Sequence, residues 1–253
     1  KVKKNDIFFA IKGKKINGNK FINKAIKKGA KTIVSNLSFQ GKKNGILYIK
    51  SSNSRKELAE VASNLYKNKP RNLIAVTGTN GKSSIADFYF QILNLNKKKV
   101  ASIGTLGVKT FKSKVNINNT TLDPISLNSH LKKIKKLNIN NVILEASSHG
   151  LQQNRLNGLN FKTGVFTNLS HDHLDYHKSY KNYLNSKLKL FKNLLKKNSN
   201  VVTDVQIPEY AILKKIAKRR NLKIFTIGYK KSNLQLINHR YKDDKQFFQI
   251  RYK

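Results

Sequence analysis

The sequence predicts an α/β protein with a small α/β N-terminal domain at residues 1–70, followed by a mostly parallel P-loop-type sheet with helices on both faces. Two observations support this prediction. After residue 71, short apolar runs alternate with helix-like segments, as in parallel strands joined by helical crossovers. A glycine-rich turn follows the first of these runs, where α/β proteins hold phosphate groups. The larger unit is therefore assigned to residues 71–253.

The first 70 residues contain three strand-like runs and two helix-like segments. The strands are predicted at residues 7–11, 32–34 and 46–49, and the helices at residues 21–28 and 55–66. Gly29 is expected to end the first helix, and Ser54 to cap the second. Pro70 marks the boundary between the two units.

From residue 71, strands and helices alternate. Strands are predicted at residues 73–77, 100–103, 142–145, 164–167, 201–203 and 224–227, and helices at residues 84–95, 126–137, 180–195 and 209–219. Ligands of such sheets bind at the carboxyl ends of the strands, so functional residues are expected just after them. The tail after Gly228 is polar except for residues 247–250, and we expect it to be the start of more structure.

The charge is strongly positive, with 52 Lys and Arg against 12 Asp and Glu, a net charge of +40. A basic, catalytically silent nucleic-acid-binding protein is one interpretation. The lysines are spread along the whole chain and Arg is scarce, which argues against a specific nucleic-acid site. No specific nucleic-acid partner is therefore predicted.

Cysteine is absent, which excludes disulfides and thiolate metal sites. No apolar run approaches the roughly 20 residues that span a bilayer, and no signal-peptide pattern is present, so we expect a cytoplasmic protein without membrane contact. Met is absent even at position 1, so we expect the chain to be a fragment of a longer protein.

The glycine-rich turn is the strongest functional signal. It comprises Gly78, Thr79, Asn80, Gly81, Lys82, Ser83 and Ser84. Glycines let backbone N–H groups surround phosphate oxygens, and the helix dipole favours negative charge. Lys82 is expected to reach the outer phosphates, and the Ser83 hydroxyl to bind Mg²⁺. The common P-loop has glycine where this chain has Val76, and a plain Gly/Asn turn is the alternative interpretation.

Two further stretches stand out. Residues 118–124 form either an Asx/Pro turn that caps the next helix or a contact surface for a polar ligand. Glu145 ends an apolar strand, where a carboxylate needs a partner. In a nucleotide site that partner is Mg²⁺, whereas an exposed strand-end Glu is the alternative.

Residues 167–177 contain three His and two Asp directly after a strand. A zinc site is an alternative, but the cluster lacks Cys and follows an apparent nucleotide sheet, where Mg²⁺ is expected. His173 is predicted to be the functional histidine, with His171 and His177 on the surface or supporting it.

The helix at residues 180–195 places Tyr183, Lys187 and Phe191 on one face, at i, i+4 and i+8. By its spacing alone, Lys187 is read as one more solvated charge.

These stretches together resemble the Mur ligases, which build the peptide of the peptidoglycan precursor. The motifs are Thr-Gly-Thr-Asn-Gly-Lys-Ser at 77–83, Asn-Thr-Thr at 119–121, Glu-Ala-Ser-Ser-His-Gly-Leu at 145–151 with Gln153 and Arg155, and the segments 165–170 and 172–177. Residues 5–22 are also similar to the small first domain of the family. The resemblance covers nearly all of residues 1–230 and is nearest to the branch that adds the third amino acid.

The resemblance implies ATP and Mg²⁺ as cofactors, with the glycine-rich turn as the ATP loop. It implies Lys82, Glu145, His173 and Lys187 as catalytic residues, Lys187 being carbamylated by CO₂. Metal ligands would be Ser83, Glu145, His173 and the Lys187 carbamate. Contacts to the UDP-N-acetylmuramoyl-dipeptide would come from Asn119, Thr120, Thr121, Ser147, Gln153 and Arg155.

The implied reaction joins an amino acid, meso-diaminopimelate or L-lysine, to UDP-N-acetylmuramoyl-L-alanyl-D-glutamate through an acyl phosphate. The protein is expected to be a monomer. The family's C-terminal domain, which selects the amino acid, is not in the sequence, so we expect residues 1–253 alone not to ligate. Another superfamily member, such as a folylpolyglutamate synthetase, is the alternative enzyme.

Overall fold

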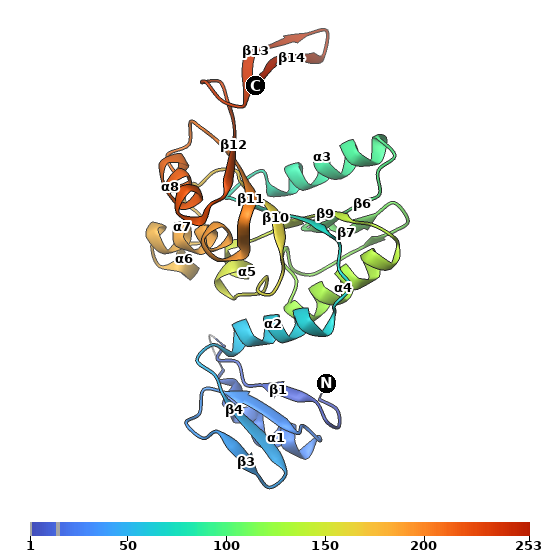
Figure 1. The fold of residues 1–253 in the computed structure, drawn as a ribbon, viewed down its shortest axis with the longest axis vertical. Helices are drawn as coiled ribbons and strands as arrows, with labels where there is room; N and C mark the ends of the chain where they lie inside the picture. The colour runs from blue at the N-terminus through green and yellow to red at the C-terminus, as the bar shows by residue number, and fades with distance from the viewer. Residues whose placement is uncertain (1, 14–15) are drawn as a thin grey trace.

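The computed structural model describes residues 2–13 and 16–253; residues 1, 14 and 15 of the predicted first domain lie outside this description. The chain forms two sheets that lie at different levels along the long axis of the molecule (Figure 1). The first part comprises β1 (Ile7–Phe9), a 3₁₀ turn (Gly18–Phe21), α1 (Ile22–Lys27), β2 (Thr32–Ser35), β3 (Gly41–Lys43), β4 (Ile46–Lys50) and α2 (Ser54–Leu65).

The second part contains the larger sheet. Its elements are β5 (Asn72–Thr77), α3 (Lys82–Leu95), β6 (Val100–Gly104), β7 (Gly107–Thr110), β8 (Lys114–Val115), α4 (Pro124–Lys136), β9 (Asn141–Glu145), α5 (Ser148–Gln152), β10 (Phe161–Phe166), α6 (Leu174–His177), α7 (Tyr180–Lys189), a π-helical turn (Leu190–Leu194), β11 (Leu195–Asp204), α8 (Tyr210–Arg220), β12 (Lys223–Gly228), β13 (Leu234–Lys242) and β14 (Lys245–Tyr252).

The small sheet has the order β1-β2-β4-β3, with β3 antiparallel to β4 and the other pairs parallel. Its core consists of Ala10, Ile22, Ala25, Ala30, Ile33 and Ile46. The three predicted strands and the helix before Gly29 are present. Strand β3 was not predicted, because its sequence Gly-Lys-Lys carries no apolar pattern.

The large sheet has the order β14-β13-β12-β11-β10-β5-β9-β6-β7-β8. All pairs from β13 to β6 are parallel, and the outer pairs β13–β14, β6–β7 and β7–β8 are antiparallel. The prediction of a mostly parallel sheet is confirmed. Strand β5, which leads into the glycine-rich turn, lies between β9 and β10 in the middle of the sheet.

Helices cover both faces of the large sheet. The side chains of β5 alternate between these faces and pack into a separate core on each. Leu73 and Ala75 point into the main cluster with residues of α4, the π-helical turn and α8. Val76 points to the other face and packs against Ala86 of α3. The predicted arrangement with helices on both faces is therefore confirmed.

Helix α2 connects the two sheets. Ser63 of α2 donates a 2.7 Å hydrogen bond to the Gly158 carbonyl of the larger unit. Gly158 has φ 79°, and a Cβ atom there would lie 2.6 Å from the Ser63 Cβ. Only a glycine fits this close approach.

Several helix ends differ from the prediction: α3 and α4 each begin two residues early, and α2 and α7 differ as follows. Asn53, not Ser54, caps α2, because its side chain accepts the Lys56 N–H. The helix predicted at residues 180–195 ends at Lys189 and continues as a π-helical turn, and Leu195 already begins β11. Asp123 caps α4 through hydrogen bonds from the Ile125 and Ser126 N–H groups, as the Asx/Pro turn interpretation expected.

The tail folds into the β13–β14 hairpin, which projects from the end of the molecule in Figure 1. Asp243 and Asp244 have φ of 49° and 55° and form its two-residue turn. In the described part of the chain, no helix is long and apolar enough to cross a membrane.

Candidate functional site

The glycine-rich turn connects β5 to α3, as predicted. Gly81 has φ 82° and lies directly before the first helical residue, Lys82. Gly78 has φ 150°, and a Cβ atom there would lie 1.8 Å from Thr167 Oγ1. A side chain at Gly78 would therefore push the turn away from the strand end that supports it.

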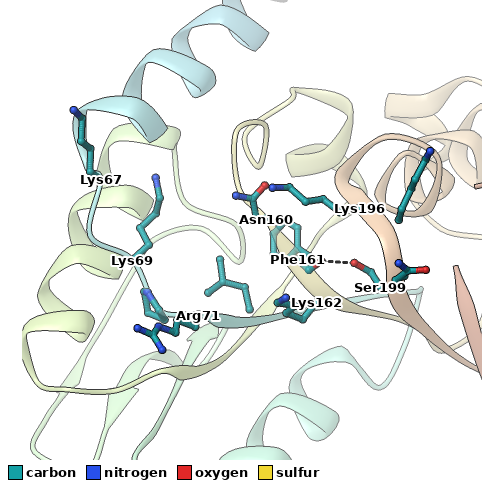
Figure 2. Close-up of a pocket in the computed structure, with 12 residues that line it drawn as sticks. Lys67, Lys69, Arg71, Asn160, Phe161, Lys162, Lys196 and Ser199 are labelled. Atoms are coloured by element: carbon teal, nitrogen blue, oxygen red, sulfur yellow. Dashed lines mark hydrogen bonds between the residues drawn. The ribbon is translucent and has the colours of Figure 1, made fainter. Parts of the chain in front are cut away.

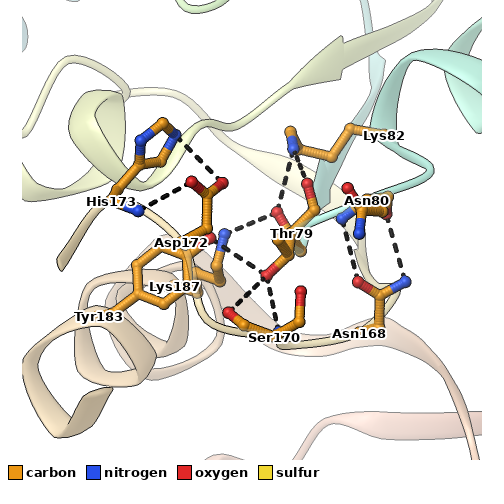
Figure 3. A network of polar contacts seen from close by, with 10 residues as sticks. Thr79, Asn80, Lys82, Asn168, Ser170, Asp172, His173, Tyr183 and Lys187 are labelled. Carbon is orange, nitrogen blue, oxygen red and sulfur yellow. Dashed lines mark hydrogen bonds and ion pairs between the residues drawn. The ribbon is translucent and has the colours of Figure 1, made fainter.

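Asn168, which follows β10, holds the turn in place (Figure 3). Its backbone carbonyl accepts the Thr79 N–H at 2.9 Å, and its side-chain Oδ1 accepts the Asn80 N–H at 3.0 Å. Thr167 donates from its hydroxyl to the Asn80 carbonyl at 2.6 Å. Because the Thr79 and Asn80 N–H groups already have acceptors, the N–H groups of residues 82–84 at the start of α3 are among those that can bind an anion.

Lys82 folds back over the turn. Its Nζ donates to the carbonyl oxygens of Gly78 at 3.1 Å and Thr79 at 2.6 Å (Figure 3). Partial burial lowers the pKa of Lys82, while the negative charges of Glu145 and Asp172 oppose that shift. The ammonium therefore occupies a position next to the turn from which it can rotate toward a phosphate.

Glu145 is buried at the end of β9, with 2% of its surface exposed. Its carboxylate accepts hydrogen bonds from the Ser83 hydroxyl at 2.9 Å and from the Thr105 N–H at 2.8 Å. A Cβ atom on Gly104 would lie 2.1 Å from Glu145 Oε1, so this glycine leaves room for the carboxylate. The predicted pair Ser83 and Glu145 thus lies together, and its hydroxyl and carboxylate oxygens are the donors that Mg²⁺ prefers.

Lys187 is not a solvated charge, contrary to the interpretation from spacing alone. It is 1% exposed and donates a 2.6 Å hydrogen bond to the Gly78 carbonyl. Its Nζ also lies 4.3 Å from the centre of the Tyr183 ring. Burial and the nearby Lys82 ammonium lower the pKa of Lys187 to about 7, against the opposing charge of Asp172.

His173 lies at the start of α6 with φ 52°. Its N–H donates to Asp172 Oδ1 at 2.8 Å, and its Nε2 lies 3.4 Å from Asp172 Oδ2. His171 is exposed beside the Tyr180 ring. His177 is buried, which fits a supporting role, and its pKa is lowered to about 4, mainly by burial and then by the neighbouring His149.

One cavity of about 150 Å³ brings the predicted catalytic and metal residues together. It is lined by Lys82, Ser83, Thr105, Thr120, Glu145, Ser147, Ser148, Asp172, His173, Tyr183 and Lys187. Most of these residues follow the carboxyl ends of β5, β6, β9 and β10 or lie on α7, and Thr120 lies between β8 and α4. Within residues 2–13 and 16–253, no group of three His, Asp or Glu side chains is placed to hold a metal, so the zinc alternative has no ligand set there.

The predicted substrate residues either line the cavity, lie exposed outside it, or form hydrogen bonds with each other beside it. Thr120 and Ser147 line the cavity, and Asn119 is exposed outside it. Thr121 donates to the Glu145 carbonyl at 2.8 Å and accepts the Ser147 N–H. Arg155 donates to Gln153 Oε1 and to the Thr121 carbonyl, so these side chains are positioned by each other.

Asn168 and Asp172 were not among the predicted site residues. Both residues follow β10, a strand in the middle of the sheet. This position after a central strand is the feature of the sequence from which they could have been predicted. Asn168 faces the turn only because residues 80 and 168 are brought together by the pairing of β5 with β10.

Two family models match the sequence. The model of the Mur ligase middle domain matches residues 76–253, and that of the Mur ligase family, catalytic domain, matches residues 1–75. Curated relatives named UDP-N-acetylmuramoyl-L-alanyl-D-glutamate–2,6-diaminopimelate ligase include one from Rickettsia montanensis, 41% identical over 243 residues. One from Clostridium tetani is 42% identical over 235 residues. The alignments cover 93% and 91% of this chain but 49% and 47% of the relatives, so the chain spans about half their length.

Solved structures show the same fold. A UDP-N-acetylmuramoyl-L-alanyl-D-glutamate–2,6-diaminopimelate ligase matches with a TM-score of 0.85 and 28% identity, over 100% of this chain and 52% of that one. A MurF ligase from Thermotoga maritima in complex with ADP matches with a TM-score of 0.58 and 20% identity, over 99% of this chain and 54% of that one. The second likeness concerns the fold alone.

Proposed function

The chain belongs to the Mur ligase family, and we propose that it is the N-terminal and middle part of an ATP-dependent ligase acting on UDP-N-acetylmuramoyl-L-alanyl-D-glutamate. The observation that carries this proposal is the single cavity that gathers Lys82, Ser83, Glu145, His173 and Lys187 beside the glycine-rich turn. The names of relatives near 40% identity support the muramoyl-dipeptide as substrate.

The amino acid we propose is 2,6-diaminopimelate, the one in the names of those relatives. L-Lysine is the alternative. The resemblance assigns its selection to a C-terminal domain, which corresponds to the part of the relatives beyond the span of this chain. We also expect a cytoplasmic monomer without a specific nucleic-acid partner.

The ATP phosphates are proposed to lie over the start of α3, where the N–H groups of residues 82–84 are available. Lys82 would exchange its bonds to the Gly78 and Thr79 carbonyls for phosphate oxygens. That exchange is favourable because the ammonium would then bond to an anionic phosphate oxygen in place of a neutral carbonyl oxygen. Burial lowers the pKa of Lys82, and the negative charge of the bound anion would raise it again.

The hydroxyl and carboxylate oxygens of Ser83 and Glu145 fit Mg²⁺, and these two residues together with a ring nitrogen of His173 are the groups that would hold it. When bound, Mg²⁺ neutralises the negative charge that the phosphates bring into the cavity. Without such neutralisation, the buried Glu145 carboxylate would repel the phosphates of ATP.

Lys187 is proposed to react with CO₂. The neutral amine nitrogen forms an N–C bond with CO₂ and releases a proton to water, which leaves a carbamate with one negative charge. A pKa of about 7 makes the neutral amine abundant at neutral pH. The product would add a further anionic oxygen ligand beside Glu145 and remove a cation that now repels Lys82.

The proposed chemistry starts when an oxygen of the substrate carboxylate attacks the γ-phosphorus of ATP. The bond from this phosphorus to the ADP oxygen breaks, and an acyl phosphate forms. The amine of the amino acid then attacks the acyl carbon, inorganic phosphate leaves, and the amine proton is lost. Lys82 would stabilise the charge on the transferred phosphoryl group.

Ser147 and Thr120 line the cavity next to Glu145, which makes them the proposed contacts nearest the reacting carboxylate. Arg155 already donates to Gln153 and to the Thr121 carbonyl. Its guanidinium has five N–H donors, so further ones remain for a carboxylate or phosphate of the substrate.

The test uses residues 1–253 extended by the C-terminal half of the Rickettsia montanensis relative. ADP release is measured with UDP-N-acetylmuramoyl-L-alanyl-D-glutamate and either meso-diaminopimelate or L-lysine. We expect turnover with meso-diaminopimelate that Lys82→Ala abolishes. No turnover with either amino acid, from a folded protein that binds ATP, would contradict the proposed substrate and favour another superfamily member.

A further inference from the structure

A second cavity, of about 550 Å³, lies at the amino ends of β5, β10 and β11 (Figure 2). One wall is the segment of residues 67–71 that joins α2 to β5, and the other is residues 196–199 of β11. Because β5 is six residues long, this cavity lies about 20 Å from the glycine-rich turn at the other end of the strand. It is therefore separate from the candidate active site.

β11 is irregular at its start, where it lines the cavity. Phe161 of β10 pairs with Leu195, but Thr163 pairs with Asn200, so residues 196–199 bulge out of the strand register. Asn198 has φ 64°, and its N–H donates to the Asn221 carbonyl at 2.8 Å. Ser199 is buried and donates from its hydroxyl to the Phe161 carbonyl at 3.0 Å. These hydrogen bonds fix the wall in place.

The cavity is lined by an unusual number of cations. Six of its twelve lining residues are Lys67, Lys69, Arg71, Lys162, Lys196 and Lys197, and none of the twelve is acidic. The whole chain has 52 Lys and Arg in 253 residues. The fraction of Lys and Arg is therefore higher in the lining of this cavity than in the chain as a whole. Among the described residues, none of these six forms an ion pair with a carboxylate.

Lys69 and Arg71 lie in the linker before β5. Lys69 is partly buried, and its Nζ donates to the Ser63 hydroxyl at 2.7 Å and to the Ser63 carbonyl. Pro70 between them is buried and fixes the backbone of the linker. Like charges gathered in this way repel each other, and a multivalent anion would relieve the repulsion.

We propose that this cavity binds a small polyphosphate anion. Its volume lies in the range of about 300 to 1,000 Å³ typical of small-molecule sites. Arg71 supplies a forked donor suited to phosphate oxygens, and the lysines supply charge. Phe161 is 1% exposed, so the cavity offers no aromatic face on which the bases of a single strand could stack.

The test measures binding of tripolyphosphate by calorimetry at 0.15 M salt (about physiological ionic strength). All proteins carry Lys82→Ala, so that the glycine-rich turn does not contribute. The cavity variant is Arg71→Gln, Lys162→Gln, Lys197→Gln. The matched control is Lys42→Gln, Lys43→Gln, Lys98→Gln, which removes the same charge at exposed positions elsewhere.

We expect one saturable site that the cavity variant weakens by about tenfold or more, and that the control weakens by less than about threefold. Equal losses in both variants would overturn the proposal in favour of diffuse charge. Tighter binding of an oligonucleotide, increasing with its length, would overturn the assignment to a small anion. A check that needs no variant is acetylation of lysines. Tripolyphosphate should protect Lys162, Lys196 and Lys197 from acetylation. Equal labelling with and without tripolyphosphate would contradict the proposal that it binds in this cavity.

Discussion

The Nζ atom of Lys187 lies 2.6 Å from the carbonyl oxygen of Gly78. A buried amine on α7 is thereby joined to the first glycine of the turn that we propose binds ATP. The same turn is held from the other side by Asn168 after β10. The geometry of the turn therefore depends on side chains about 90 and 110 residues further along the chain.

Carbamate formation at Lys187 should increase as the pH rises through about 7. The neutral amine reacts with CO₂, and burial together with the Lys82 charge brings the pKa of Lys187 to about 7. With ¹³C-labelled bicarbonate, a carbamate carbon signal is expected that grows between about pH 6 and 8. The signal should be absent in Lys187→Ala. A signal that persists in this variant would assign the carbamate to another lysine.

Lys187 should also lower the free energy of unfolding at low pH, where its amine is protonated. Its folded-state pKa, about 7, lies below the unfolded value of 10.5. Folding therefore opposes protonation of this amine. The resulting loss of stability is complete below about pH 7 and disappears as the pH rises toward 10.5. Lys187→Met should raise the melting temperature by about 2 °C or more at pH 6 and by less at pH 10. An equal shift at both values would contradict the lowered pKa.

Ser83 and Ser84 form a matched pair of positions. The Ser83 hydroxyl contacts the Glu145 carboxylate, whereas Ser84 is exposed and its hydroxyl makes no hydrogen bond within the described residues. Ser83→Ala should weaken Mg²⁺-dependent ATP binding by about tenfold or more, because the proposed metal ligand is lost. Ser84→Ala should change it by less than about threefold, since the backbone N–H groups remain. Equal effects on the Kd for Mg·ATP would remove the proposed role of Ser83.

Asn168→Ala should loosen the glycine-rich turn. The Asn80 N–H loses its side-chain acceptor, at a cost of about 1 kcal/mol. Weaker ATP binding is expected, with a fall in melting temperature of a few degrees at most. Asn168→Asp retains the acceptor and should preserve the turn, while its negative charge should still disfavour the phosphates. Unchanged nucleotide affinity in Asn168→Ala would show that the turn is held without this side chain.

Local patterns of the sequence predicted most of the large sheet. Strand β5, the turn and α3 follow from one contiguous apolar–glycine–helical pattern. The strands β7, β8, β13 and β14 were not predicted, because they are short or polar and pair antiparallel with neighbours. Such pairings depend on contacts that single-sequence periodicity does not encode.

The site was predictable where residues follow strand ends. Glu145 beside Ser83 is the clearest case, since the carboxyl ends of β5 and β9 share one edge. The burial of Lys187 was not visible from its spacing in a lysine-rich helix, because it results from packing of α7 against the turn. The basic cavity was not predicted either, since the residues that line it are far apart in the sequence and one wall bulges out of the register of β11.

The central claim is ligation through an acyl phosphate. The most direct test gives the extended protein a muramoyl-dipeptide in which both oxygens of the terminal carboxylate are ¹⁸O, together with ATP and the amino acid, and analyses the phosphate released. The account predicts that each phosphate carries one ¹⁸O atom, because the carboxylate oxygen attacks phosphorus and leaves with it. Unlabelled phosphate, or release of AMP and pyrophosphate, would contradict it.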